Sequence, residues 1–265
     1  MSNVYLPLVA TAPAPGIAPA SVNARGFGVG IRWQSDAPGV ATTLRLLHPV
    51  CWYNWWWYPR GQAESPRPYP PNYYPMIWNP SASNLYCWPD EAVTATASWW
   101  FIGNEPINPQ TRHIITYAPS LMANQARAFG YQAHREYVLC GEYLDEPGIA
   151  YCRELQRLGC VPIAWHWHIY PTSPEDWLAT VRRAFTFDPN RPVIVTETAL
   201  WGQPPDAQRR LMDRIMWALG EYEQLHAVMW YDSYDAAFPP VSLLTAPGPG
   251  CALTETGRHY VDVTR

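Results

Sequence analysis

Lysine is absent from this chain of 265 residues, so all 18 of its basic residues are arginines. Charge of either sign is scarce, because Asp, Glu, Lys and Arg make up 15% of the sequence, against about 25% in an average soluble domain. The formal net charge is −4, and no stretch gathers the arginines into a basic stripe that neutralises phosphates. We therefore expect no nucleic acid partner.

Long apolar runs and closely spaced cysteine pairs are also missing. No run approaches the roughly 18 to 20 apolar residues that cross a bilayer, so we expect no membrane span. None of the six cysteines forms a Cys-x-x-Cys pair or has metal-finger spacing. We expect a disulfide between Cys152 and Cys160, which lie on and just past a predicted helix, while other pairings and buried free thiols stay open. The other four cysteines are Cys51, Cys87, Cys140 and Cys251.

Proline, tryptophan and tyrosine are abundant. The 29 prolines are about twice the number that an average usage near 5% predicts, and 15 Trp and 17 Tyr accompany them. Residues 1–24 are rich in Pro and Ala and are typical of a tether that follows a removed signal peptide or lipid anchor. We expect residues 25–265 to form one catalytic domain of a secreted or cell-surface protein, present as a monomer.

Short β-branched or aromatic runs alternate with helical patterns along the chain, which indicates βα units and a parallel sheet. The clearest helix runs over 174–185, where Ser173 and Asp176 can form a capping box. Other helices are expected over 40–47, 114–132 with an interruption at Pro119, 148–158, 206–223 and 254–263. The eight expected strands are 27–33, 49–55, 73–78, 98–103, 137–141, 162–170, 192–199 and 227–231.

Eight strands with intervening helices in about 240 residues match a single (β/α)8 TIM barrel. A doubly wound open sheet is the alternative. Gly26, Gly28 and Gly30 argue against it, because they alternate within the first strand and do not form the Gly-x-Gly-x-x-Gly turn of a dinucleotide fold. The sequence therefore predicts the barrel.

Three expected strands end in a glutamate: Glu105 on the fourth, Glu142 on the fifth and Glu197 on the seventh. Active sites of such barrels lie at the carboxyl ends of the strands. Two carboxylates that converge there suit glycosidic bond cleavage, with one protonated as the acid and the other ionised as the nucleophile. Glu105 and Glu197 fit best, and Glu142 is the alternative for either.

Asn104-Glu105-Pro106 on the fourth strand, together with Glu197 on the seventh, resembles the large clan of retaining (β/α)8 glycoside hydrolases. Further motifs are similar to glycoside hydrolase family 128, the alkali-sensitive-linkage-protein-like endo-β-1,3-glucanases, from about residue 27 to the C-terminal helix. These motifs are Trp52-Tyr53-Asn54-Trp55, Tyr74-Pro75-Met76-Ile77-Trp78, Gly103-Asn104-Glu105-Pro106, His168-Ile169-Tyr170 and Val195-Thr196-Glu197.

The resemblance implies a role for each matched residue. Glu105 would be the acid/base, Glu197 the nucleophile, and Asn104 a partner of the sugar 2-hydroxyl. His168 and Tyr170 alternate on one face of strand six, so either can donate to Glu197; the alternative for both is a core position.

Aromatic residues are expected to bind the sugar. The stretch 52–88 holds six Trp and six Tyr, and aromatic faces pack well on the apolar faces of pyranose rings. We expect Asn54, Trp55 and Trp78 to touch sugar; the alternative is that several of the aromatics, Trp52 and Trp78 among them, fill the core beside strands two and three. Trp230 on strand eight is expected to form the floor under the sugar, with a packed core position as the alternative.

His166 and His168 form a His-x-His pair that can place two imidazoles on one strand face and bind zinc. The sequence offers no third ligand at the same mouth, so we expect no metal and no other cofactor. The function predicted is a retaining hydrolase of a β-linked polysaccharide or oligosaccharide, an endo-β-1,3-glucanase by the resemblance. Xylan and mannan stay open as substrates, as does a barrel that binds carbohydrate without cleaving it.

Overall fold

The computed structural model of the chain describes residues 25–31, 37–55, 72–77, 99–107, 118–133 and 136–265. Eight parallel strands follow one another in a ring, in the order β2-β1-β8-β7-β6-β5-β4-β3. A single bridge between Trp52 and Tyr73 joins β2 to the residues before β3. The strands are β1 (Gly26–Gly30), β2 (Trp52–Tyr53), β3 (Met76–Ile77), β4 (Trp99–Ile102), β5 (Glu136–Tyr143), β6 (Ala164–His168), β7 (Val193–Thr198) and β8 (Leu225–Trp230).

This ring confirms the predicted (β/α)8 barrel, and the doubly wound alternative is wrong. A doubly wound sheet reverses its strand order at a switch point and keeps two open edges. Here the last strand pairs with the first, since Phe27 of β1 lies opposite Val228 of β8.

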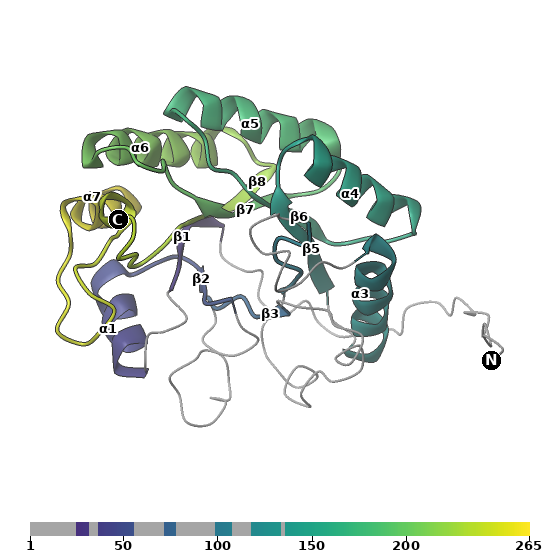
Figure 1. Cartoon of the computed structure of the whole chain (residues 1–265), viewed down its shortest axis with the longest axis horizontal. Coiled ribbons are helices and arrows are strands. Elements are labelled where there is room, and N and C mark those ends of the chain that lie inside the picture. Colours follow the sequence, from purple (N-terminus) through teal and green to yellow (C-terminus); the bar gives the residue numbers. More distant parts are fainter. Residues whose placement is uncertain (1–24, 32–36, 56–71, 78–98, 108–117, 134–135) are drawn as a thin grey trace.

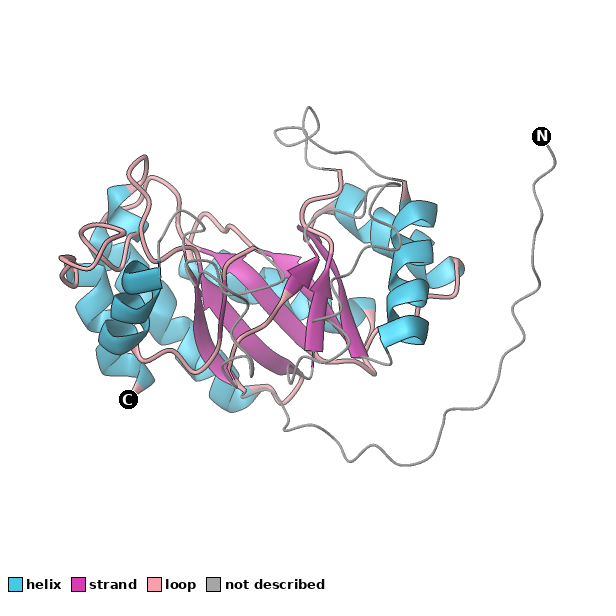
Figure 2. Cartoon of the chain, turned by 90° about the horizontal axis from the view of Figure 1, so that it is seen from below, coloured by secondary structure: helices cyan, strands magenta, loops and turns pink. Residues whose placement is uncertain are grey.

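Helices surround the strands in chain order (Figure 1), and Figure 2 shows helices to the left and to the right of the ring of strands. Among the described residues none is long and apolar enough to span a bilayer. Ser173 caps α5 by accepting from the Asp176 amide, as the capping box predicts. The described α-helices are α1 (Ala37–Leu47), α3 (Pro119–Ala133), α4 (Glu146–Arg157), α5 (Pro174–Phe187), α6 (Pro205–Glu221) and α7 (Glu255–Thr264), with a short 3₁₀ turn η1 (Pro239–Val241).

Pro119 begins a helix, which corrects the expected interruption within 114–132. Proline is tolerated in the first turn because its missing N–H would have no helical partner there. The part of that prediction before residue 118 lies outside the described residues.

The predicted Cys152–Cys160 disulfide is wrong, because Cys152 is bonded to Cys140. Cys152 lies on the buried face of α4 with Ile149 and Leu155, and this face packs on the barrel at β5. The Cα atoms of Cys140 and Cys152 are 6.5 Å apart. Cys160 stays a buried thiol, and the disulfide ties α4 to the strand that precedes it.

Alternating side chains divide the core into two layers, as the two faces of a strand require. The inner layer fills the barrel with residues from the strands, among them Tyr53, Phe101 and Met229. The outer layer lies between the strands and the helices and includes Trp165, Trp177 and Tyr260.

Candidate active site

Glu105 lies in the turn after β4, in a backbone conformation unusual for its type. Its φ is 47°, in the left-handed region, which costs on the order of 1 to 3 kcal/mol for a residue other than glycine. Its amide donates to the Gly141 carbonyl at 2.6 Å. A Cβ on Gly141 would lie 2.6 Å from the Gly103 oxygen, so glycine is needed there for β5 to approach the Glu105 turn.

Glu197 belongs to β7 itself, and its side chain is buried. Trp55 Nε1 donates to its Oε1 at 2.6 Å, and the Tyr170 hydroxyl donates to its Oε2 at 2.5 Å. The Tyr53 hydroxyl lies 3.4 Å from Oε1 and donates at 2.8 Å to the Thr196 carbonyl. Donors on both oxygens favour an ionised carboxylate.

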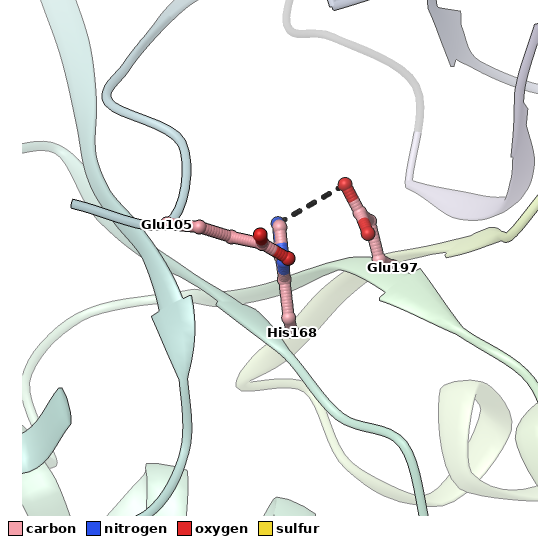
Figure 3. A group of neighbouring side chains, drawn as sticks. All are labelled: Glu105, His168 and Glu197. Atoms are coloured by element: carbon pink, nitrogen blue, oxygen red, sulfur yellow. Dashed lines mark hydrogen bonds and ion pairs between the residues drawn. The ribbon is translucent and has the colours of Figure 1, made fainter. Parts of the chain in front are cut away.

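His168 stands between the two glutamates, at the end of β6 (Figure 3). Its Nδ1 is 3.0 Å from Oε1 of Glu105, and its Nε2 is 3.4 Å from Oε1 of Glu197. One oxygen of each glutamate and one nitrogen of His168 all lie within 4.8 Å of one another. The barrel therefore brings the two predicted carboxylates together around one imidazole.

Burial and charge act against each other in this group. Burial lowers the pKa of His168, but the neighbouring Glu197 and Glu105 outweigh it, and the pKa is raised overall. Burial raises the pKa of Glu197; His168 opposes this, Glu105 adds to it, and the hydrogen bonds from Tyr170 and Trp55 oppose it. The pKa of Glu197 still lies above its ordinary value, so each donor matters for keeping this group ionised.

Within the described part of the chain, Glu105, His168 and Glu197 form the one group whose atoms are close enough to be considered for a metal ion. His168 contacts both glutamates at hydrogen-bond or ion-pair distances, 3.0 Å to Glu105 and 3.4 Å to Glu197. His166 is not in this group: its Nδ1 lies 3.1 Å from the Thr196 hydroxyl, and its ring stacks on Phe101. The His-x-His pair therefore does not converge on one site.

Glu142 neighbours the Glu105–His168–Glu197 group but is not a member of it. Its Oε1 accepts the Tyr143 amide and its Oε2 the Ile107 amide, both at 2.9 Å. Burial raises the pKa of Glu142 to about 7, against those two amides and His168.

The other predicted site residues differ in how close they lie to the two glutamates. Asn104 is half-buried and directly precedes Glu105, and Trp55 contacts Glu197. Asn54 is buried and accepts from the Tyr73 hydroxyl at 2.6 Å. Trp78 lies outside the described residues.

The expectation that Trp230 forms the floor under the sugar is wrong. Its side chain is fully buried in the outer core layer, edge-to-face with Phe27. Its Nε1 donates to the Val241 carbonyl at 2.8 Å. Strand alternation explains this, since Met229 points into the barrel and Trp230 therefore points toward the helices.

Tyr231, and not Trp230, lies beside the aromatic residues of the site. The sequence analysis did not predict Tyr231 as a site residue. Its ring lies 5.7 Å from that of Trp55, 5.9 Å from that of Tyr170 and 5.3 Å from that of Trp201. Tyr53 was also missed, although its alternation with Trp55 was a usable signal. A Cβ on Gly30 would lie 2.8 Å from the Trp55 ring, so this glycine of β1 makes room for that ring.

No family model matches the chain, and no curated protein matches its sequence. Solved structures do match its fold. A glycoside hydrolase family 128 (subgroup I) endo-β-1,3-glucanase from Amycolatopsis mediterranei, in complex with laminaritriose, has a TM-score of 0.69 at 16% identity, covering 89% of this chain and 98% of that one. A subgroup II endo-β-1,3-glucanase from Sorangium cellulosum has a TM-score of 0.68 at 18% identity, with the same coverage of 89% and 98%. A subgroup V exo-β-1,3-glucanase from Cryptococcus neoformans has a TM-score of 0.68 at 17% identity, again covering 89% and 98%.

Proposed function

We propose that the protein is a β-1,3-glucanase that cuts internal bonds with retention of configuration. The observation that carries the proposal is the convergence of Glu105 and Glu197, with His168 between them, at the carboxyl ends of the barrel strands. Retaining glycosidases hold their two carboxyl groups about 5 to 5.5 Å apart, and inverting ones about 6.5 to 9.5 Å. One oxygen of Glu105 lies within 4.8 Å of one oxygen of Glu197, a close approach that agrees with the shorter, retaining separation. The likeness in fold to β-1,3-glucanases of family 128 supports the substrate.

The surroundings of the two carboxylates suggest their roles. Glu197 receives hydrogen bonds from Tyr170 and Trp55, which suits an ionised nucleophile. Glu105 faces Nδ1 of His168 and is hydrogen-bonded to Tyr143. A tyrosine hydroxyl can donate to the ionised carboxylate or accept from the protonated acid. This suits a residue that must give up a proton in one step and take one in the next.

The proposed reaction has two displacements. A Glu197 oxygen bonds to the anomeric carbon while the glycosidic bond breaks, and the departing sugar oxygen takes the proton of Glu105. Glu105 then removes a proton from water, whose oxygen attacks the anomeric carbon and frees Glu197. Trp55, Tyr231 and Asn104 are proposed to contact the sugar.

Export from the cytosol belongs to the same proposal. The Cys140–Cys152 disulfide supports it, because such bonds persist mainly in oxidising compartments.

A panel of β-1,3-glucan, β-1,4-glucan, xylan and mannan tests the function, with NMR of the first-formed product for its anomeric configuration. We expect β-1,3-oligosaccharides of retained configuration, and losses of roughly 10² to 10⁴-fold in Glu105→Gln and Glu197→Gln. Glu154→Gln, at an exposed site on α4, is the matched control and should stay active. Binding without products would instead indicate a carbohydrate-binding barrel, and release from another glycan would change the substrate.

Azide distinguishes the two glutamates on a dinitrophenyl glycoside. It should rescue Glu105→Ala with a β-glycosyl azide as product, because the anion attacks the glycosyl-enzyme without needing a base. Rescue of Glu197→Ala should give the α-azide. The opposite pair of products would exchange the roles.

A further inference from the structure

Glu142 is a buried carboxylate at the end of β5 that the proposed reaction does not use. Its side chain has an exposed fraction of 2%. Each of its oxygens accepts a backbone amide, from Ile107 and from Tyr143, both at 2.9 Å. A buried carboxylate is costly unless such donors satisfy it.

Both hydrogen bonds of Glu142 fix residues that are connected to Glu105, one along the chain and one through a side chain. Ile107 lies two residues after Glu105, so the first bond fixes the chain that leaves the Glu105 turn. The second fixes the backbone of Tyr143, whose side chain is hydrogen-bonded to Glu105. Gly141, directly before Glu142, accepts the Glu105 amide itself. Three consecutive residues of β5 therefore hold Glu105.

Glu105 needs such support because its left-handed backbone is unfavourable without it. β5 can give this support because its end is itself fixed. Its register against β6 shifts between Cys140 and Glu142, and Cys140 is bonded to α4. At the start of α4, a Cβ on Gly148 would lie 3.0 Å from Cγ of Glu142. Glu142 is packed against that helix and has little room to move.

We propose that Glu142 is a positioning residue for Glu105: its carboxylate holds Ile107 and Tyr143 so that the Glu105 carboxyl stays aimed at the glycosidic oxygen. This inference rests on the acid/base role of Glu105 in the proposed function. Glu142 itself touches no reacting atom in this scheme.

Burial and the two amides act on the pKa of Glu142 in opposite directions. Burial raises the pKa of its carboxyl and Glu105 raises it further, whereas the amides of Ile107 and Tyr143 and the neighbouring His168 lower it, which leaves it at about 7. The two amides thus favour the charged form that binds them both.

The test compares two leaving groups in Glu142→Ala, Glu142→Gln and Glu105→Ala. A β-1,3-linked oligosaccharide needs protonation of its leaving oxygen, whereas a dinitrophenyl β-glycoside of the same sugar does not. A misplacement near 1 Å can cost about 10²-fold, so kcat/KM of Glu142→Ala on the oligosaccharide should fall by about that factor, with little change on the dinitrophenyl substrate. Azide should also raise its kcat on the dinitrophenyl substrate, since the base for the second step is misplaced.

Glu142→Gln keeps one acceptor oxygen and should lie between the wild type and Glu142→Ala. If the alanine variant does not fold, Glu142→Gln carries the same comparison. The inference is overturned if the Glu142 variants lose activity equally on both substrates, or on neither, while Glu105→Ala still loses activity on the oligosaccharide alone. If Glu105→Ala itself loses both substrates equally, the acid/base role is wrong and the inference falls with it. Glu154→Gln again serves as the matched control.

Discussion

Replacing Glu142 by glutamine should change how the stability of the protein depends on pH. The carboxyl has a pKa of about 7 in the fold, against an ordinary value of 4.5. Between these values the folded protein keeps a proton that the unfolded chain has released, so the free energy of unfolding falls as pH rises. The two pKa values differ by about 2.5, and one unit corresponds to about 1.4 kcal/mol, so this contribution amounts to about 3 kcal/mol. It is present below about pH 4.5 and lost above about pH 7.

Urea unfolding of the wild type and of Glu142→Gln, at several values between about pH 4.5 and 8, measures this contribution. Groups that titrate alike in both proteins cancel in the difference between them. The wild type should therefore lose about 3 kcal/mol relative to Glu142→Gln as pH rises. Glu154→Gln is the control. Its free energy of unfolding should differ from that of the wild type by an amount that varies with pH by less than roughly 0.5 kcal/mol.

Parallel curves for the wild type and Glu142→Gln would refute the reasoning, because they would mean that Glu142 has the same pKa in the folded and unfolded states. The substitution should affect stability and activity in opposite directions. At neutral pH and above, Glu142→Gln is relieved of a buried charge, yet it should be the poorer enzyme on natural linkages. A trade-off of this kind is common at functional sites.

Two further predictions concern Glu197 and the disulfide. Tyr170→Phe removes a donor that lowers the pKa of Glu197, so the acid limb of the kcat/KM profile should move up by roughly 1 to 2 pH units; an unmoved limb would contradict this. Replacing Cys140 and Cys152 together by alanine opens a link across 12 residues, worth about 3 kcal/mol, so calorimetry should show Tm lower by roughly 6 to 12 °C. An unchanged Tm would show that the bond does not constrain the unfolded chain.

The sequence predicts the barrel and the convergence of Glu105 with Glu197, because both follow from the chain order of apolar runs. A glutamate after a strand stays at the mouth even when the strand bounds are off by several residues, as they are for β2 and β3. Identification of the pair therefore did not depend on knowing the register.

Details that depend on register could not be predicted. Whether Trp230 or Tyr231 faces the mouth depends on the parity of a single residue, and the pairing of β7 with β8 shifts between Val195 and Thr198. A similar shift after Cys140 precedes Glu142 and Tyr143. The Cys140–Cys152 bond depends on how α4 lies over β5, which spacing along the chain does not show.

The ring of strands should open locally at a lower free energy at the join between β2 and β3 than between its other strands. Among the described residues, Trp52 carries this join, with its amide donating to Asn72 and its carbonyl accepting from Tyr74, whereas β5 and β6 pair over several residues. Segments with few backbone hydrogen bonds open at lower free energy than the global unfolding. Trp55, which follows β2, donates to Glu197. Opening at this join would therefore remove a donor from Glu197 while the ladder from β4 to β8 stays intact. The proposed chemistry would then be lost before the fold.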